Sequence, residues 1–331
     1  MLLLSALLAL ASISLDRIAP MPREARGWVT RHTFNHKAPV RAVTTTADGY
    51  VIGDKAGVLL MWDAKTGKLR ETLLDGTNER AKPIDAVRLT PDGRRLDFVT
   101  RGDTGQIEMA GKDSVLHGPT DFAGPNLALA ADGNWLTVRL DRDVPDPKTL
   151  HLLQRRFTAN GFGGNRLHYF VHAADVRLAA GASRFVVSSD VTGTVHGWKP
   201  RKEQEVERAV WSVDLKKLDP TALAVSPNGE MVAVAGASGA VEVLDAKRGK
   251  PVAALKGHKG AVRAVAFTAD SGLIATGGDD GTVRLWNPWT GEQEYLLAGH
   301  TAPVTAVWFA PDDALMTASD DKTARVWVYK P

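Results

Sequence analysis

Residues 257–292 read GHKGAVRAVAFTADSGLIATGGDDGTVRLWNPWTGE, from Gly257 to Glu292. This stretch contains three short segments, 261–268, 273–277 and 282–286, which are rich in Val, Ala, Ile and Phe or alternate apolar with polar residues. Segments of this kind predict β-strands. Turns containing Asp and Gly separate them, so the stretch predicts consecutive strands joined by tight turns.

The same pattern follows at once in residues 299–331, GHTAPVTAVWFAPDDALMTASDDKTARVWVYKP, and places Trp286 and Trp327 41 residues apart. A repeat of this length that opens with Gly-His and ends its third strand with Trp resembles the WD40-repeat family. The resemblance implies an all-β fold, a WD40 β-propeller built from four-stranded antiparallel blades.

In WD40 blades a His before the first strand, a Ser or Thr in the second, an Asp in the next turn and a Trp in the third form a hydrogen-bonded chain. Such a chain pairs buried polar groups that would each cost about 1–3 kcal/mol if left alone. A catalytic trio is the alternative interpretation, but two copies with Trp at a fixed spacing favour a structural role. The structural tetrads that the resemblance implies are His258, Thr276, Asp280 and Trp286, and His300, Thr317, Asp321 and Trp327.

The same repeat unit recurs along the rest of the chain. The residues at the Trp position of successive units are 62, 110, 153, 198, 244, 286 and 327, which predicts a seven-bladed propeller. Six blades remain the alternative if the third or fourth unit is an irregular excursion. The approximate blade bounds are 36–74, 84–117, 122–171, 173–215, 221–256, 258–298 and 300–331.

The strand pattern at 28–34, WVTRHTF, precedes the first unit, while the last unit stops after three strands. The family resemblance implies that this N-terminal strand becomes the outer strand of the last blade, which removes an open sheet edge. We therefore expect 28–34 to close the ring and the propeller to span 28–331.

The other units keep less of the tetrad. Unit one has His36 and Trp62 but carries Ala56 where the turn Asp would stand, and unit four keeps Trp198 without His or Asp in register. Ala110 occupies the Trp position of unit two, and Leu153 and Leu244 occupy it in units three and five. We expect packing alone to hold these middle blades together.

Residues 1–15, MLLLSALLALASISL, are apolar or small throughout and are followed by the charged, proline-containing segment 16–27. The apolar run is too short to span a bilayer, for which about 20 residues are needed. With Ala9-Leu10-Ala11 as a cleavage site, it is typical of a secretory signal, and 16–27 then reads as a linker. We expect an exported protein; an uncleaved anchor and a cytoplasmic protein with a spurious extension are the alternatives.

Composition narrows the classes of chemistry. The chain has 331 residues, no cysteine and 41 basic against 38 acidic residues that are well mixed. Thiolate metal sites and iron–sulfur clusters are therefore absent, and nothing indicates a nucleic-acid partner or any cofactor. Two His pairs at a spacing of four, His32 with His36 and His168 with His172, would lie about 13 Å apart along a strand, too far to share a metal ion. The glycine-rich segment 160–165 is interpreted as a loop without the Lys-Ser or Lys-Thr of a phosphate cradle.

The family resemblance also places a set of residues on the narrow top face around the central channel, where partners of such propellers usually dock. These are the residues before the turn Asp and those at the start of the first strands: Arg41, Lys55, Asp85, Asp103, Asp146, Arg263, Asp279, Thr305 and Asp320.

Two functions are compatible with this sequence. The first is a non-catalytic, monomeric interaction scaffold that presents its top face to a protein partner. The second is an extracytoplasmic propeller that acts as an enzyme or small-ligand binder, with its site at the channel mouth formed by Asp103, Asp279 and Asp320. The sequence shows no nucleophile, metal set or cofactor motif for the second, so we expect no enzyme activity.

Overall fold

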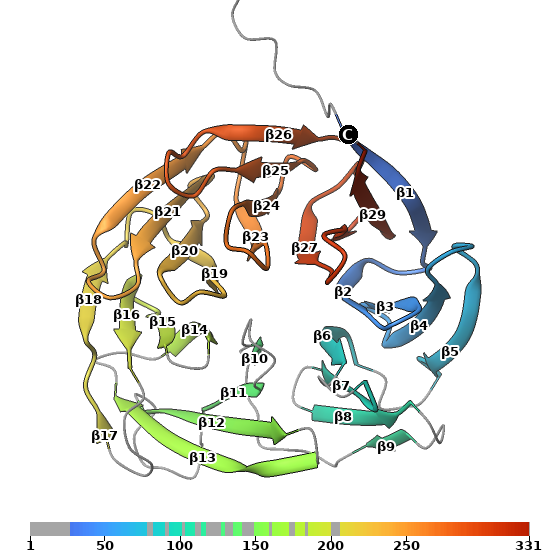
Figure 1. The fold of residues 1–331 in the computed structure, drawn as a ribbon, viewed down its shortest axis with the longest axis horizontal. Coiled ribbons are helices and arrows are strands. Elements are labelled where there is room, and N and C mark those ends of the chain that lie inside the picture. Colours follow the sequence, from blue (N-terminus) through green and yellow to red (C-terminus); the bar gives the residue numbers. More distant parts are fainter. Residues whose placement is uncertain are drawn as a thin grey trace, which may run out of the picture.

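The computed structural model describes residues 27–77, 82–89, 93–100, 103–109, 114–116, 127–129, 135–140, 149–158, 161–171, 176–182, 185–199 and 206–330. Within these residues the regular secondary structure consists of strands, β1 to β29, which form seven sheets. The sheets stand as blades around a central axis, down which Figure 1 looks. This confirms the seven-bladed propeller. No helix in the described part of the chain is long and apolar enough to cross a membrane.

The first four blades follow the chain in order. Blade 1 contains β2 (Val40–Thr45), β3 (Gly49–Asp54), β4 (Val58–Asp63) and β5 (Leu69–Asp75). Blade 2 contains β6 (Ile84–Leu89), β7 (Arg95–Thr100), β8 (Asp103–Glu108) and β9 (Ser114–Leu116). Blade 3 contains β10 (Leu127–Leu129), β11 (Trp135–Leu140), β12 (Thr149–Thr158), β13 (Gly161–Val171) and β17 (Val206–Glu207). Blade 4 contains β14 (Val176–Ala182), β15 (Phe185–Asp190), β16 (Thr194–Trp198) and β18 (Trp211–Asp214).

The last three blades complete the ring. Blade 5 contains β19 (Pro220–Val225), β20 (Met231–Gly236), β21 (Ala240–Asp245) and β22 (Pro251–Lys256). Blade 6 contains β23 (Val262–Phe267), β24 (Ile274–Gly278), β25 (Val283–Trp286) and β26 (Gln293–Leu297). Blade 7 contains β27 (Val304–Phe309), β28 (Leu315–Ser319), β29 (Thr323–Tyr329) and β1 (Trp28–Asn35).

The N-terminal strand closes the ring, as the sequence predicts. β1 pairs antiparallel with β29, from Trp28 opposite Tyr329 to Asn35 opposite Thr323. Because β1 supplies the outer strand that the C-terminal unit lacks, the two ends of the propeller are held in one sheet, and β29 has no open edge.

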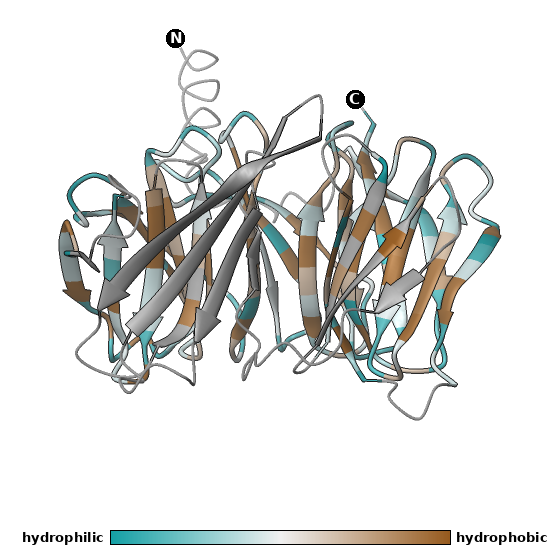
Figure 2. Ribbon diagram, turned by 90° about the horizontal axis from the view of Figure 1, so that it is seen from below, coloured by the Kyte–Doolittle hydropathy of each residue, from teal (hydrophilic) through white to brown (hydrophobic). Residues whose placement is uncertain are grey.

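In blades 1 and 5 burial falls from the second strand to the outer strand. Every residue of the second strands β3, β15, β20, β24 and β28 is buried, whereas the outer strands β5 and β22 are largely exposed. Figure 2 shows this edge-on: hydrophobic segments run through the middle of the strands, and hydrophilic turns line both edges of the disc.

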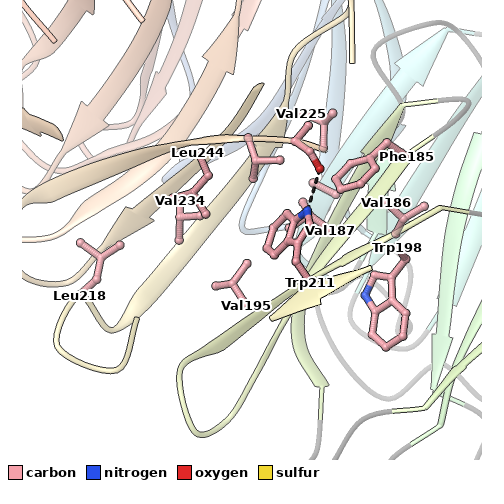
Figure 3. Close-up of a cluster of buried hydrophobic side chains, with 13 residues drawn as sticks. Phe185, Val186, Val187, Val195, Trp198, Trp211, Leu218, Val225, Val234 and Leu244 are labelled. Carbon is pink, nitrogen blue, oxygen red and sulfur yellow. Dashed lines mark hydrogen bonds between the residues drawn. The ribbon is translucent and has the colours of Figure 1, made fainter. Parts of the chain in front are cut away.

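The cores lie between neighbouring blades. Figure 3 shows the one shared by blades 4 and 5, where Trp198 and Phe185 of blade 4 and Leu244 of blade 5 belong to one cluster of buried side chains. In the same cluster the Trp211 indole N–H donates to the Ala246 carbonyl over 2.7 Å. Leu244 is fully buried, so an apolar side chain fills the Trp position of blade 5.

The residue predicted to occupy the Trp position of blade 2 was wrong. In blade 1 the last residue of the first strand lies opposite Tyr50, and Tyr50 lies opposite Trp62. In blade 2 the last residue of the first strand lies opposite Leu96, and Leu96 lies opposite Ile107. Ile107, and not Ala110, therefore stands in the place of Trp, and it is buried. The cause is a shorter hairpin, since β7 and β8 remain paired up to Thr100 and Asp103.

The glycine-rich segment was also wrongly interpreted as a loop. Residues 161–165 begin β13, which pairs with β12 from Gly161 opposite Thr158 to Val171 opposite Thr149. A long hairpin accommodates these glycines because its partner strand supplies the backbone hydrogen bonds that a free loop would lack. Of the expected signal (1–15) and linker (16–27), residues 1–26 lie outside the described residues, as does Asp146.

Candidate functional site

Two chains of hydrogen bonds run through blades 6 and 7. In blade 6 the Trp286 indole N–H donates to the Thr276 hydroxyl over 2.8 Å, and that oxygen lies 2.8 Å from Nε2 of His258. The other ring nitrogen, Nδ1, lies 3.0 Å from a carboxylate oxygen of Asp280. Because a carboxylate only accepts, Nδ1 carries the proton and Nε2 accepts one from Thr276.

Blade 7 repeats this geometry. Trp327 donates to the Thr317 hydroxyl over 3.0 Å, His300 Nε2 lies 2.8 Å from the same oxygen, and His300 Nδ1 lies 2.9 Å from Asp321. The structure thus brings together the four side chains of each predicted tetrad, one set in blade 6 and one in blade 7.

The turn carboxylates are held ionised by their donors. Burial by itself would raise the pKa of Asp280, but the Lys259 N–H, the Thr282 hydroxyl and His258 outweigh it and lower the pKa to about 2. Asp321 has the same surroundings, and its pKa is also lowered to about 2. Burial lowers the pKa of His258 and His300 against the opposing effect of their aspartates, so both rings are neutral at pH 7.

These trios do not form a nucleophilic site. The side chains of Thr276 and Thr317 have no exposed surface, and each hydroxyl already accepts from an indole. A substrate therefore cannot reach either oxygen, and the tetrads serve to pair buried polar groups.

The glycine of each Gly-His pair makes room for an arginine. A Cβ on Gly257 would lie 2.7 Å from Nη1 of Arg284, which donates to the Gln293 side chain over 2.6 Å. Arg284 Nη2 also lies 3.8 Å from Asp280, so this guanidinium links the tetrad to the outer strand β26. A larger residue at 257 would displace it.

Blade 1 contains a partial tetrad with its carboxylate in an unexpected place. Asp54, and not a residue at position 56, lies 3.3 Å from His36 Nδ1 and accepts the backbone N–H groups of Ala56 and Val58. Ile52 occupies the Thr position, so His36 Nε2 and Trp62 Nε1 are buried without a hydrogen-bond partner. The prediction that blade 1 lacks an acid in its tetrad was therefore wrong.

Blade 4 also has polar partners that the sequence analysis missed. Trp198 Nε1 donates to the Ser188 hydroxyl over 2.6 Å, which reproduces the Trp–Thr link of blades 6 and 7. Asp190 lies eight residues before its Trp, as Asp54 does, whereas Asp280 and Asp321 lie six before theirs. Asp190 Oδ2 is 3.3 Å from Nε2 of His196. His196 comes from the third strand rather than from the segment before the first, which is why counting from Trp198 does not find it.

The first strand of six blades carries a bulge at its second residue, where the pairing register with the next strand shifts. A bulge leaves one residue out of the ladder and re-aims its side chain. The bulged residues are Arg41, Asp85, Arg177, Thr221, Arg263 and Thr305. We call the edge of the disc on which they lie, together with the turns between second and third strands, the top face.

Four charged residues of alternating sign follow one another across the top face of blades 6, 7 and 1. Arg263 pairs with Asp279 within blade 6, and Arg41 of blade 1 pairs with Asp320 of blade 7, Nη2 lying 3.3 Å from Oδ1 without hydrogen-bond geometry. The hydrogen bond with Asp279 raises the pKa of Arg263, and the charge of Asp320 adds to that rise. We call Asp279, Arg263, Asp320 and Arg41 the charged arc.

The other residues predicted for the top face have different surroundings. The Thr305 hydroxyl donates to the Val40 carbonyl over 2.7 Å and thereby joins blade 7 to blade 1. Lys55 is exposed in the β3–β4 turn, and Asp85 is the bulged residue of blade 2. Asp103 is the first residue of β8, opposite Thr100, and therefore does not occupy the turn position assigned to it.

Two bulged residues were not predicted, Arg177 and Thr221. The Thr221 hydroxyl donates to the Val262 carbonyl of blade 6, in the same way as Thr305 does between blades 7 and 1. A count from the first apolar residue of each first strand would have found both, because each follows one residue after it.

Comparisons with known proteins agree with this geometry. The family model described as "WD domain, G-beta repeat" matches residues 249–287 and 291–328, which hold most of blade 6 and blade 7. A second model, "Anaphase-promoting complex subunit 4 WD40 domain", matches residues 204–267. Both matches support the WD40-repeat family, and the repeat model itself covers residues 249–287 and 291–328.

Among solved structures, the chain is similar to the computationally designed Ika8 protein. The two share 19% sequence identity and superpose with a TM-score of 0.67 over 90% of this chain and 99% of the designed chain. At this identity the likeness shows the fold alone. None of the curated proteins searched matches the chain.

Proposed function

We propose that this propeller is a non-catalytic scaffold that binds a protein partner through the charged arc on its top face. The observation that supports this is the alternation of Asp279, Arg263, Asp320 and Arg41 across three blades, with side chains 28–44% exposed. Each charge is already positioned by a neighbour of opposite sign, so a partner would meet ordered donors and acceptors and lose little side-chain entropy on binding.

The partner that fits is a polar protein surface with charges of both signs. The two positive and two negative charges of the arc offset each other, so the arc has no strong positive potential. A nucleic acid or another polyanion would require such a potential. It gives register and specificity instead, because a partner with the wrong order of charges would leave ions unpaired.

The second candidate, a small-molecule or catalytic site at the channel mouth, has weaker support. Asp103 does not occupy the turn position that such a site needs, while Asp279 and Asp320 each engage an arginine. Among the described residues, no group of three His, Cys, Asp or Glu side chains is placed to hold a metal ion.

The test exploits the pair formed by Arg41 and Asp320. The single changes Arg41→Asp and Asp320→Arg break the ion pair, whereas the double change restores it with reversed polarity. Quantitative affinity capture from the native host should lose the partner with the double variant, although its urea midpoint stays near that of the wild type. Arg248→Asp, on the opposite edge, is the control. Undiminished capture by the double variant would exclude the arc as the binding site.

We also propose that the protein is exported, with residues 1–11 as a signal and the propeller acting as a monomer outside the cytoplasm. The apolar run 1–15 and the small residues Ala9 and Ala11 support this proposal.

A further inference from the structure

Large exposed apolar side chains gather on the face opposite to the charged arc. The third strand of each blade ends, and its outer strand begins, at one edge of the disc. We call this edge the lower face. Of the exposed large apolar side chains in the described part of the chain, only Val191, in the β15–β16 turn, lies on the top face. The others lie at the lower face and form what we call the rim: Val29, Leu69, Val210, Val252, Trp289 and Tyr329.

The rim follows from equivalent positions in five consecutive blades, 4, 5, 6, 7 and 1. Leu69 is the first residue of β5 and pairs with Trp62, Trp289 lies in the turn from β25 to β26, and Tyr329 ends β29 opposite Trp28. Val210 directly precedes β18, and Val252 is the second residue of β22. Blades that repeat around an axis place such positions on one side of the disc, the side of the C-terminal end in Figure 2.

Contacts between blades connect these positions. In blades 5, 6 and 1 the glycine of the turn before the outer strand packs against the outer strand of the preceding blade. Gly249 packs on Trp211, Gly291 on Ala254 and Gly67 on His32. Each of these turns is thereby fixed to its neighbour, so the rim side chains stand on a rigid support.

Two of the rim residues are aromatic and strongly exposed. Trp289 is 54% exposed and Tyr329 is 50% exposed. Tyr329 is held edge-on against Trp28 and Tyr295, with ring centroids 6.0 Å away in both contacts. Trp and Tyr have an apolar body and a polar tip, a combination that favours the boundary between lipid and water.

Basic side chains border the rim. The acidic residues of the same turns point their carboxylates at the turn itself, since Asp63 accepts the Thr66 N–H and Asp245 accepts the Arg248 N–H. Two aspartates of the neighbouring turns, Asp48 and Asp312, pair with Arg70 and Arg31. The exposed cations of the lower face are concentrated in two turns, Lys65 and Lys68 in blade 1 and Lys247, Arg248 and Lys250 in blade 5, with Lys330 after β29. The exposed acids Glu230, Asp270, Glu292 and Asp313 lie in other turns of the same face.

The chain enters the propeller at this rim. The Gly27 carbonyl accepts the Lys330 N–H, and Gly27 abuts the Tyr329 ring. The first and last strands of the propeller therefore meet at the lower face.

We propose that the rim binds the surface of an anionic lipid bilayer. Apolar side chains spread over five blades of a flat face fit a plane, whereas a peptide would require a groove. Trp289, Tyr329 and Leu69 enter the headgroup region, while the lysines and Arg248 face lipid phosphates, each basic residue contributing about 1 kcal/mol near such a surface. The top face then points away from the membrane and stays open to a partner.

Vesicle sedimentation of the purified full chain tests this. Vesicles of phosphatidylcholine mixed with phosphatidylglycerol should carry the protein down. The double variant Trp289→Ser/Leu69→Ser should lower the partition coefficient about tenfold through lost apolar insertion. Lys247→Ala/Arg248→Ala should weaken binding about thirtyfold on the mixed vesicles and leave pure phosphatidylcholine unaffected. Val191→Ser, on the top face, is the matched control and should bind like the wild type.

The N-terminal segment is unchanged in every variant, so differences between variants report the rim alone. Thermal melts identify any variant that fails to fold. Two results would overturn the proposal. If the wild type stays in solution with both vesicle types, the rim is not a lipid-binding surface and a protein partner is the remaining occupant. If all variants sediment equally, the N-terminal segment binds and the rim does not.

Discussion

Asp54 binds His36 from a position two residues ahead of the turn aspartates Asp280 and Asp321, with 3.3 Å between Oδ2 and Nδ1. The blade 1 chain is nevertheless interrupted, because Ile52 separates His36 Nε2 from Trp62 Nε1 and offers neither a partner. Blade 1 thus has both ends of such a tetrad but no hydroxyl between them.

Ile52→Thr should therefore repair the chain. Thr and Val have the same shape, and in an apolar core Thr is normally the less stable of the two by about 1–3 kcal/mol. At position 52 we expect the reverse order, with Ile52→Thr more stable than Ile52→Val by about 1 kcal/mol in urea melts, because the hydroxyl satisfies two buried atoms.

Val234→Thr is the matched control for this repair. Val234 occupies the same position in blade 5, where Leu244 replaces Trp, so the added hydroxyl meets no indole N–H and should destabilise. An Ile52→Thr variant less stable than Ile52→Val would show that the two buried nitrogens are not accessible to a residue at this position.

Stability should fall as the pH is lowered, in two steps. The pKa values of His258 and His300 lie below 6.5 in the folded state, so their contribution is present above pH 6.5 and is lost as the pH falls through the folded values. The pKa values of Asp280 and Asp321 are about 2, so their contribution is present above pH 3.8 and is lost towards pH 2.

Urea midpoints measured between pH 8 and pH 4 check the first step. The double variant His258→Gln/His300→Gln should lose much of the slope on the acid side of pH 6.5, since Gln does not titrate. An unchanged slope would assign the acid sensitivity to other groups.

Removal of residues 1–35 should open the ring. β29 would lose its partner β1, and an exposed strand edge promotes aggregation. We expect loss of cooperative melting or precipitation, measured by calorimetry and light scattering. The control lacks only residues 1–26 and retains β1. If both truncated proteins melt alike, β1 does not contribute to the closure.

Mass spectrometry of the protein from its own host should find an N-terminus near Ser12, as expected for cleavage after Ala11. An intact Met1 on the protein would contradict the proposed export.

The fold could be predicted from the sequence because the blade pattern recurs at a nearly constant period, and two copies keep every polar residue. Errors occurred where turn length changed. The short β7–β8 hairpin moves the Trp position to Ile107, and a fixed count back from Trp62 passes over Asp54. In blade 4, His196 enters the network from a different strand, so no spacing rule reveals it. The pairing of Arg263 with Asp279 depends on the bulge in β23, a feature of three-dimensional register.

We propose that Asp280 and Asp321 are structural while their neighbours Asp279 and Asp320 bind the partner, and urea melts of four single variants distinguish the two roles. Asp280→Ala and Asp321→Ala should each destabilise by about 1–3 kcal/mol, because each leaves buried donors unpaired. Asp279→Ala and Asp320→Ala should change stability by no more than about 0.5 kcal/mol, since solvent-accessible ion pairs at the surface contribute little. Equal losses within each pair of neighbours would contradict this division and would require every residue of the charged arc to be reassigned.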